Sequence, residues 1–216
     1  WRFTLVRAIA FDLDGTLIDS TDAIVASVAH TFEVLEQTAP SREAIIATIS
    51  LPLEAQFGQL WERVPDDAVP VYRAHYAEHA PGMTTLLPGV REALALAVDS
   101  GLPLGVATSK GRDASRQLLE HLGVLDRFRM VIGPEDVANP KPAPDAIHAA
   151  AAALGVDTAD MAYIGDSPFD IRAAKAAGAR AIAVSTGYCS AAELWRYEPD
   201  VLVHSLLDAV RAVTQA

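Results

Sequence analysis

Five short apolar segments recur along this 216-residue chain, and they constrain its fold more than any other feature. Each spans six residues and is almost continuously apolar: 7–12, 103–108, 128–133, 161–166 and 180–185. Such segments are typical of parallel strands whose sheet is covered by helices on both faces. We therefore expect them to form one parallel sheet.

Helical patterns fill the stretches between these segments. They cover residues 89–100, 113–122, 143–154 and 168–177, and the last three are followed directly by Gly123, Gly155 and Gly178. Glycine at that position readily adopts the left-handed backbone conformation that ends many helices. The alternation predicts an α/β fold, a doubly wound, Rossmann-like parallel sheet.

Residues 20–86 interrupt this alternation. They contain no convincing strand, and apolar positions at helical spacing predict helices over 22–37, 41–48, 53–62 and 66–79. The pairs Pro81-Gly82 and Pro88-Gly89 suit turning connections at the end of this region. We expect a helical cap subdomain over residues 20–86, inserted into an α/β core of residues 1–19 and 87–216.

The composition narrows the partners and the environment. A formal charge of −11 disfavours nucleic acid or an anionic membrane surface as the main partner. The single cysteine, Cys189, cannot form an internal disulfide, and no apolar stretch reaches the roughly 18 residues that span a bilayer. We expect a cytoplasmic protein, either a monomer or a homodimer.

Polar side chains follow three of the five predicted strands. Because parallel strands place their carboxyl ends at one edge of a sheet, these side chains should meet in one crevice. Close carboxylates repel one another unless a divalent cation lies among them, and an oxygen-rich site without cysteine suits Mg²⁺. The candidate residues are Asp12, Asp14, Thr108, Ser109, Lys141, Asp166 and Asp170.

Four short motifs then point to a family. DLDGT at 12–16, TS at 108–109, KP at 141–142 and GDSPFD at 165–170 resemble, in order and rough spacing, the motifs of the haloacid dehalogenase-like phosphatases. The resemblance covers nearly the whole chain, including the inserted cap. More narrowly, the chain resembles the branch of phosphoglycolate phosphatases, β-phosphoglucomutases and cytosolic pyrophosphatases.

The resemblance implies a role for each motif residue. Asp12 would be the nucleophile that forms an aspartyl-phosphate, and Asp14 the general acid and then the general base. Thr108, Ser109 and Lys141 would bind the substrate phosphate, with Thr108 and Lys141 counted among the catalytic residues. Mg²⁺ would be held by Asp12, the Asp14 backbone carbonyl and Asp166, with Asp170 ordering the metal site.

The resulting hypothesis is a Mg²⁺-dependent phosphatase acting on a small phosphorylated metabolite. The leading candidate for that substrate is 2-phosphoglycolate. A phosphomutase or a pyrophosphatase on the same site remains an alternative, as does a non-catalytic phosphate-binding regulatory protein. Dehalogenation is disfavoured, because the relatives with that activity lack the second acid that Asp14 supplies. His75 and His79 lie four residues apart on a predicted helix, but we interpret them as structural.

Overall fold

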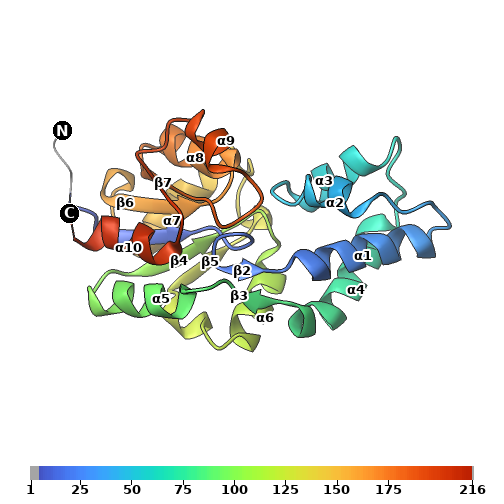
Figure 1. Cartoon of the computed structure of the whole chain (residues 1–216), viewed down its shortest axis with the longest axis horizontal. Coiled ribbons are helices and arrows are strands. Elements are labelled where there is room, and N and C mark those ends of the chain that lie inside the picture. The colour runs from blue at the N-terminus through green and yellow to red at the C-terminus, as the bar shows by residue number, and fades with distance from the viewer. Residues whose placement is uncertain (1–4, 216) are drawn as a thin grey trace.

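The computed structural model describes residues 5–215 and has two lobes, a sheet-containing core and a helical lobe that we call the cap (Figure 1). The core holds a six-stranded parallel sheet of order β5-β4-β1-β6-β7-β8. Its strands are β1 (Ala8–Phe11), β4 (Leu104–Ala107), β5 (Met130–Ile132), β6 (Met161–Gly165), β7 (Arg180–Val184) and β8 (Val201–Val203). The doubly wound α/β class predicted from the sequence is confirmed.

Alternate residues of β1 serve the two faces of this sheet. Ile9 and Phe11 belong to one hydrophobic cluster, while Ala8 and Ala10 belong to the other, and all four are fully buried. This follows from the two-residue repeat of a strand, whose successive side chains point to opposite faces. The central strand therefore needs apolar residues at every position.

Helices cover both faces of the sheet. The cluster of Ile9 includes residues of α5 (Val90–Asp99), α6 (Arg112–His121) and α10 (Leu206–Thr214), and the cluster of Ala8 includes residues of α7 (Asp145–Leu154), α8 (Pro168–Ala177) and α9 (Ala191–Trp195). Gly155 and Gly178 end α7 and α8 with φ of 73° and 77°. Short 3-10 turns lie at Leu125–Arg127, Pro134–Asp136 and Thr158–Asp160.

The cap consists of α1 (Thr21–Val34), α2 (Arg42–Ile46), α3 (Leu53–Leu60) and α4 (Ala68–Met83). Aromatic side chains hold it together: Phe57 packs edge-on against both Trp61 and Tyr72, and Trp61 stacks on Phe32. The four helices lie within the predicted range 20–86, whose limits as a subdomain stay a prediction.

Two antiparallel connections join the lobes. β2 (Ile18–Asp19) enters the cap and β3 (Thr85–Leu86) leaves it, paired as Ile18 with Leu86 and Asp19 with Thr85. The Leu87 N–H extends the pairing by donating to the Leu17 carbonyl at 3.0 Å. The expectation that residues 20–86 contain no strand was therefore wrong at β3, which is too short to show an alternating pattern.

The expected turn at Pro81-Gly82 was also wrong, because α4 runs through Pro81 to Met83. Proline lacks the N–H that would bond to the carbonyl four residues earlier, here that of Ala77. The Gln117 side chain on α6 donates to that carbonyl at 3.3 Å. A partner from the core thus replaces the missing helical hydrogen bond.

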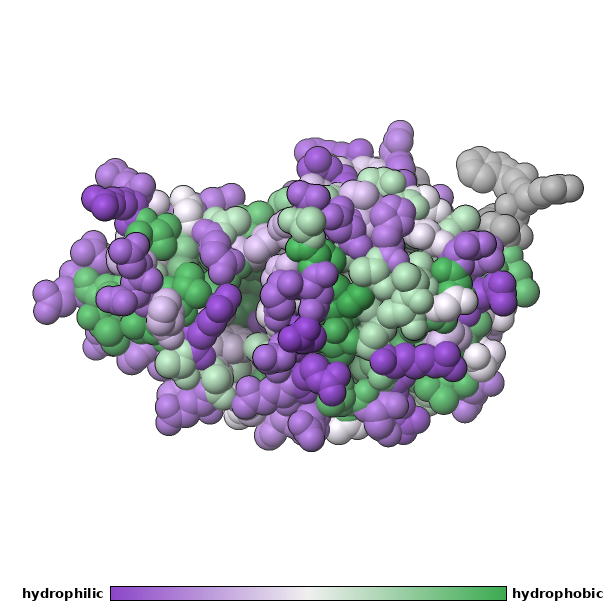
Figure 2. Space-filling view, turned by 180° about the vertical axis from the view of Figure 1, so that it is seen from behind, coloured by the Kyte–Doolittle hydropathy of each residue, from purple (hydrophilic) through white to green (hydrophobic). Residues whose placement is uncertain are grey.

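The surface is mostly polar. Figure 2 shows hydrophilic residues spread over both lobes, with apolar areas between them. Large hydrophobic side chains that are exposed include Trp195, which is 62% exposed. Within residues 5–215, no helix combines the length and apolar character needed to cross a bilayer.

We expect Phe57→Ala to lower the free energy of unfolding by about 3–5 kcal/mol, because it leaves a cavity in the aromatic cluster of the cap. Phe57 is fully buried. Urea unfolding measures the change. Val34→Ala, at a cap position that is 49% exposed, is the control and should stay within about 0.5 kcal/mol of the parent protein. An equal loss of unfolding free energy in the two variants would contradict a stabilising role for the aromatic cluster.

Candidate active site

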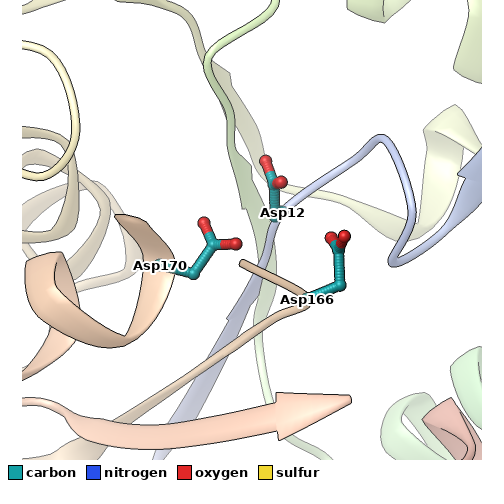
Figure 3. A group of neighbouring side chains, drawn as sticks. All are labelled: Asp12, Asp166 and Asp170. Atoms are coloured by element: carbon teal, nitrogen blue, oxygen red, sulfur yellow. The ribbon is translucent and has the colours of Figure 1, made fainter. Parts of the chain in front are cut away.

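Three carboxylates meet at the carboxyl edge of the sheet. Asp12 follows β1, Asp166 follows β6, and Asp170 lies in the first turn of α8. In Figure 3 their carboxylates point into one shared space, and each offers an oxygen within 4.8 Å of the others. β1 lies between β4 and β6, where the strand order reverses, so the group occupies the crevice in which α/β sheets bind ligands.

Lys141 connects two of these carboxylates, those of Asp12 and Asp170. Its Nζ donates to Asp12 Oδ1 at 2.9 Å, to Asp170 Oδ1 at 2.6 Å and to the Tyr163 hydroxyl at 3.0 Å. The Tyr163 hydroxyl donates in turn to the Ala107 carbonyl at 2.5 Å. All three hydrogens of the ammonium group are therefore engaged, which fixes the position of a side chain only 2% exposed.

Burial and like charges dominate the electrostatics. Burial raises the pKa of Asp12 to about 6, with Lys141 opposing the shift and Asp170 adding to it. Burial also raises the pKa of Asp166 well above its ordinary value, and the neighbouring Asp170 and Asp12 raise it further. For Lys141, burial lowers the pKa, but the attraction of Asp12 and Asp170 prevails, so the lysine keeps its charge. Three carboxyl groups thus share the positive charge of one lysine.

The site fits a hard divalent cation. Its ligand atoms are carboxylate oxygens, and their mutual repulsion is the kind that a cation relieves. Space around Asp166 is kept clear by glycines: a Cβ at Gly15 would lie 2.4 Å from Asp166 Oδ2, and one at Gly187 only 1.8 Å. Gly15 also has a φ of 78°, which disfavours any side chain there.

Asp166 and Asp170 are held by further hydrogen bonds. Asp166 Oδ1 accepts from the Thr16 hydroxyl at 2.9 Å. Asp170 Oδ2 accepts from the Ser167 N–H at 3.0 Å and its hydroxyl at 2.6 Å, closing a capping box at the start of α8. With Oδ1 on Lys141, both Asp170 oxygens accept hydrogen bonds, which suits a residue that orders its neighbours.

Asp14 lies apart from the three carboxylates. Its Oδ1 accepts from the Ser20 hydroxyl, and its Oδ2 forms an ion pair with Lys110 Nζ at 3.2 Å. Burial lowers the pKa of Lys110, but the attraction of Asp14 outweighs it, and the pKa lies above its ordinary value. The Lys110 Nζ also donates to the Tyr76 hydroxyl on α4 at 2.8 Å. Asp14 is thus connected to the cap.

A cleft of about 740 Å³ opens between the lobes at this edge. Thr108 and Ser109 line it from the core, next to Asp12 and Asp14. Within residues 5–215, the buried Ser109 Oγ has no hydrogen-bond partner, and neither has the buried Nε2 of Gln56, which lines the cleft from α3. The predicted phosphate-binding hydroxyls therefore face the same space as the two acids that follow β1.

Several residues that contribute to the site were not identified from the sequence. Lys110 follows the TS motif directly and resembles an ordinary solvated lysine, while Tyr163 is hidden in a strand pattern. His75 and His79 stack at 4.1 Å, and His75 Nδ1 is 3.0 Å from the Ser27 hydroxyl. Within residues 5–215, the group of carboxylates able to hold a metal includes no histidine, and the structural interpretation of His75 and His79 stays a prediction.

Comparison with known proteins finds relatives of the whole chain. Residues 9–184 match the family model described as Haloacid dehalogenase-like hydrolase. The chain is 39% identical to a protein named Probable phosphatase IndB from Dickeya dadantii, over 94% of this chain and 92% of that protein. It is 32% identical to the protein named Phosphoglycolate phosphatase from Escherichia coli, over 98% of this chain and 94% of the relative.

A solved structure agrees with this comparison. The crystal structure of a predicted phosphatase from Clostridium acetobutylicum superposes with a TM-score of 0.89 at 25% identity. The match covers 99% of this chain and 100% of the other. Both lobes therefore have counterparts in that protein.

We expect Gly187→Ala to weaken Mg²⁺ binding about 10- to 100-fold, because the added methyl group displaces the Asp166 carboxylate. Isothermal titration calorimetry measures the affinity. Gly58→Ala is the matched control, since a Cβ there meets no atom within 4 Å and the affinity should not change. Equal affinities for both variants would show that Asp166 does not hold the ion.

The affinity for Mg²⁺ should also decrease as the pH is lowered. Asp12 must lose its proton to bind a metal, and its pKa is raised to about 6 by burial, so protons compete below that value. Between pH 7.5 and pH 5 we expect about a tenfold loss of affinity, by calorimetry on protein shown by circular dichroism to stay folded. A constant affinity across this range would contradict a role for Asp12 as a ligand.

Proposed function

The chain belongs to the haloacid dehalogenase-like hydrolase family and is a phosphatase, and we propose that it hydrolyses a small phosphate monoester with the help of Mg²⁺. The best candidate substrate is 2-phosphoglycolate. The observation that carries the proposal is the position of Asp12, which lies at the end of β1, is oriented by Lys141 and borders the cleft between the lobes.

Asp12 is the nucleophile in this proposal. One of its carboxylate oxygens attacks phosphorus, the bond from phosphorus to the leaving oxygen breaks, and an aspartyl-phosphate forms. Lys141 holds Asp12 Oδ1 at 2.9 Å, which keeps the carboxylate in place for attack. Thr108 and Ser109 donate hydrogen bonds to the phosphate oxygens, and the partnerless Ser109 hydroxyl supports this role.

Asp14 completes both steps. It gives a proton to the leaving oxygen, and then takes one from the water that attacks the aspartyl-phosphate and releases inorganic phosphate. To do so its carboxyl group turns from Ser20 and Lys110 toward the leaving oxygen. The reaction therefore needs a local rearrangement at Asp14.

Four acids would hold the metal: Asp12 and Asp166 through their carboxylates, Asp14 through its backbone carbonyl, and Asp170 by ordering the site. Bound Mg²⁺ offsets the repulsion between the Asp12 carboxylate and the phosphate oxygens. The all-oxygen set and the space kept by Gly15 and Gly187 support this assignment.

The named relatives support the choice of substrate. The Escherichia coli protein is named Phosphoglycolate phosphatase and aligns with this chain over almost its full length. Phosphomutase and pyrophosphatase activities would use the same Asp12 and Asp14, and they stay predictions, as does the non-catalytic alternative. The cytoplasmic location and the monomeric or homodimeric state also stay predictions.

The first test is phosphate release from 2-phosphoglycolate, β-glucose 1-phosphate and pyrophosphate, with Mg²⁺ and after its removal by EDTA. We expect turnover of 2-phosphoglycolate that is lost with EDTA and restored by Mg²⁺. Asp12→Asn should reduce kcat by at least about 10³-fold, since it removes the nucleophile.

Asp126→Asn is the control for this experiment, because that side chain is 77% exposed and lies outside the cleft lining. Its kcat should match that of the parent protein. Turnover that survives Asp12→Asn would overturn the mechanism. Interconversion of glucose phosphates without phosphate release would favour the mutase.

A further inference from the structure

Resting on the proposed function, we propose that Lys110 and Tyr76 form a second anion-binding subsite in the cleft. This subsite binds a carboxylate or phosphate carried by the leaving group of the substrate. It selects phosphorylated substrates, esters or anhydrides, whose leaving group carries a second negative charge.

The subsite lies where the two lobes meet. Lys110 follows β4 in the core, and Tyr76 belongs to α4 of the cap. Lys110 Nζ donates to the Tyr76 hydroxyl at 2.8 Å and lies 4.4 Å from the centre of its ring. Both residues line the cleft beside Asp12 and Asp14. A ligand bound at Asp12 would thus reach contacts from both lobes.

Lys110 differs from the other cations that line the cleft. Its side chain is only 10% exposed. Arg73 is 66% exposed and pairs with Glu54 at 3.2 Å, while Arg112 is 42% exposed and pairs with Asp136. Exposed pairs of this kind contribute little, whereas a buried cation interacts strongly with an anion brought next to it. Lys110 is therefore the better candidate for recognising charge on a substrate.

The ion pair between Lys110 and Asp14 connects the subsite with the proposed mechanism. In this structure both Asp14 oxygens are engaged, one by Ser20 and one by Lys110. In the proposed mechanism Asp14 turns to the leaving oxygen, which leaves Lys110 with the neutral Tyr76 hydroxyl alone. A buried ammonium group without a counter-charge is costly. An anionic group on the leaving side replaces the lost carboxylate. A neutral leaving group leaves that cost uncompensated.

An independent observation supports a polar ligand on this side of the cleft. Gln56 on α3 is 4% exposed, and its Nε2 has no hydrogen-bond partner among the described residues. Buried amide donors without partners are rare in folded proteins. Gln56 lines the same cleft as Lys110, so a leaving group with acceptor oxygens would satisfy both.

Three substrates distinguish leaving groups that carry a carboxylate, a phosphate or no charge. 2-Phosphoglycolate carries a carboxylate on its leaving group, and pyrophosphate carries a second phosphate. 2-Hydroxyethyl phosphate has the size of 2-phosphoglycolate but lacks the second charge. We expect the parent protein to have a higher kcat/KM for at least one charged substrate than for the neutral one.

The variant Lys110→Met tests the subsite. We expect the ratio of kcat/KM for the preferred charged substrate to that for 2-hydroxyethyl phosphate to fall about 10- to 100-fold, the range for losing a hydrogen bond to a charged group. Any loss from releasing Asp14 affects both substrates and cancels in the ratio. Arg73→Met, at the exposed rim, is the control and should change the ratio less than about twofold.

Tyr76→Phe removes only the hydroxyl that contacts Lys110, and it serves if Lys110→Met fails to fold. The same ratio should fall about 3- to 10-fold, the range for one hydrogen bond. A ratio that falls only for 2-phosphoglycolate identifies a carboxylate subsite, and one that falls only for pyrophosphate identifies a phosphate subsite. An unchanged ratio in both variants would overturn the proposal and leave Lys110 as a partner of Asp14 alone.

A binding experiment separates this proposal from the proposed function. Calorimetry with Asp12→Asn measures the affinity for 2-phosphoglycolate, pyrophosphate and 2-hydroxyethyl phosphate without turnover. Adding Lys110→Met should weaken binding of the charged ligand at least about tenfold more than that of the neutral one. Equal weakening would overturn the subsite even if the enzyme is active. Selective weakening would support it even if the parent protein releases no phosphate.

Discussion

The repulsion between buried carboxylates at the end of β1 and β6 is the constraint on which this structure depends. Asp12, Asp166 and Asp170 lie close enough to share one cation, in surroundings that disfavour their charged forms. Lys141 offsets part of this charge through two short ion pairs. Gly15 and Gly187 leave space beside the Asp166 carboxylate, where a metal ion would offset the remaining negative charge. The fold thus holds together a group of carboxyl groups whose repulsion is relieved by Lys141, by protons or by a bound cation.

The sequence was sufficient to predict the core because that information is local. Each internal strand is a continuous apolar run, since both faces of the sheet are covered, and Gly155 and Gly178 end their helices at the expected residues. The carboxylates could be placed together because strands that run in parallel bring their carboxyl ends to one edge. The motif order then related the chain to its family.

The remaining features depend on contacts between distant residues. The hydrogen bond from Gln117 that lets α4 continue through Pro81 joins two lobes, and no local pattern indicates it. Lys110 is recognisable only once Asp14 and Tyr76 are seen beside it. β8 is an edge strand of three half-buried residues, and with α9 and α10 it was not anticipated from the apolar runs. Tertiary packing decides each of these cases.

Asp170 connects the stability of α8 with the chemistry of the site. One of its oxygens closes the first turn of that helix, and the other holds Lys141, which positions Asp12 at the far end of the sequence. Assembly of the active site during folding must therefore await the C-terminal half of the chain. During synthesis on the ribosome, Asp12 emerges before Lys141, which lies 129 positions later in the chain, and it gains its lysine and helix contacts only after α8 has been made. The site around Asp12 is therefore complete only after Lys141 and Asp170 have both been made.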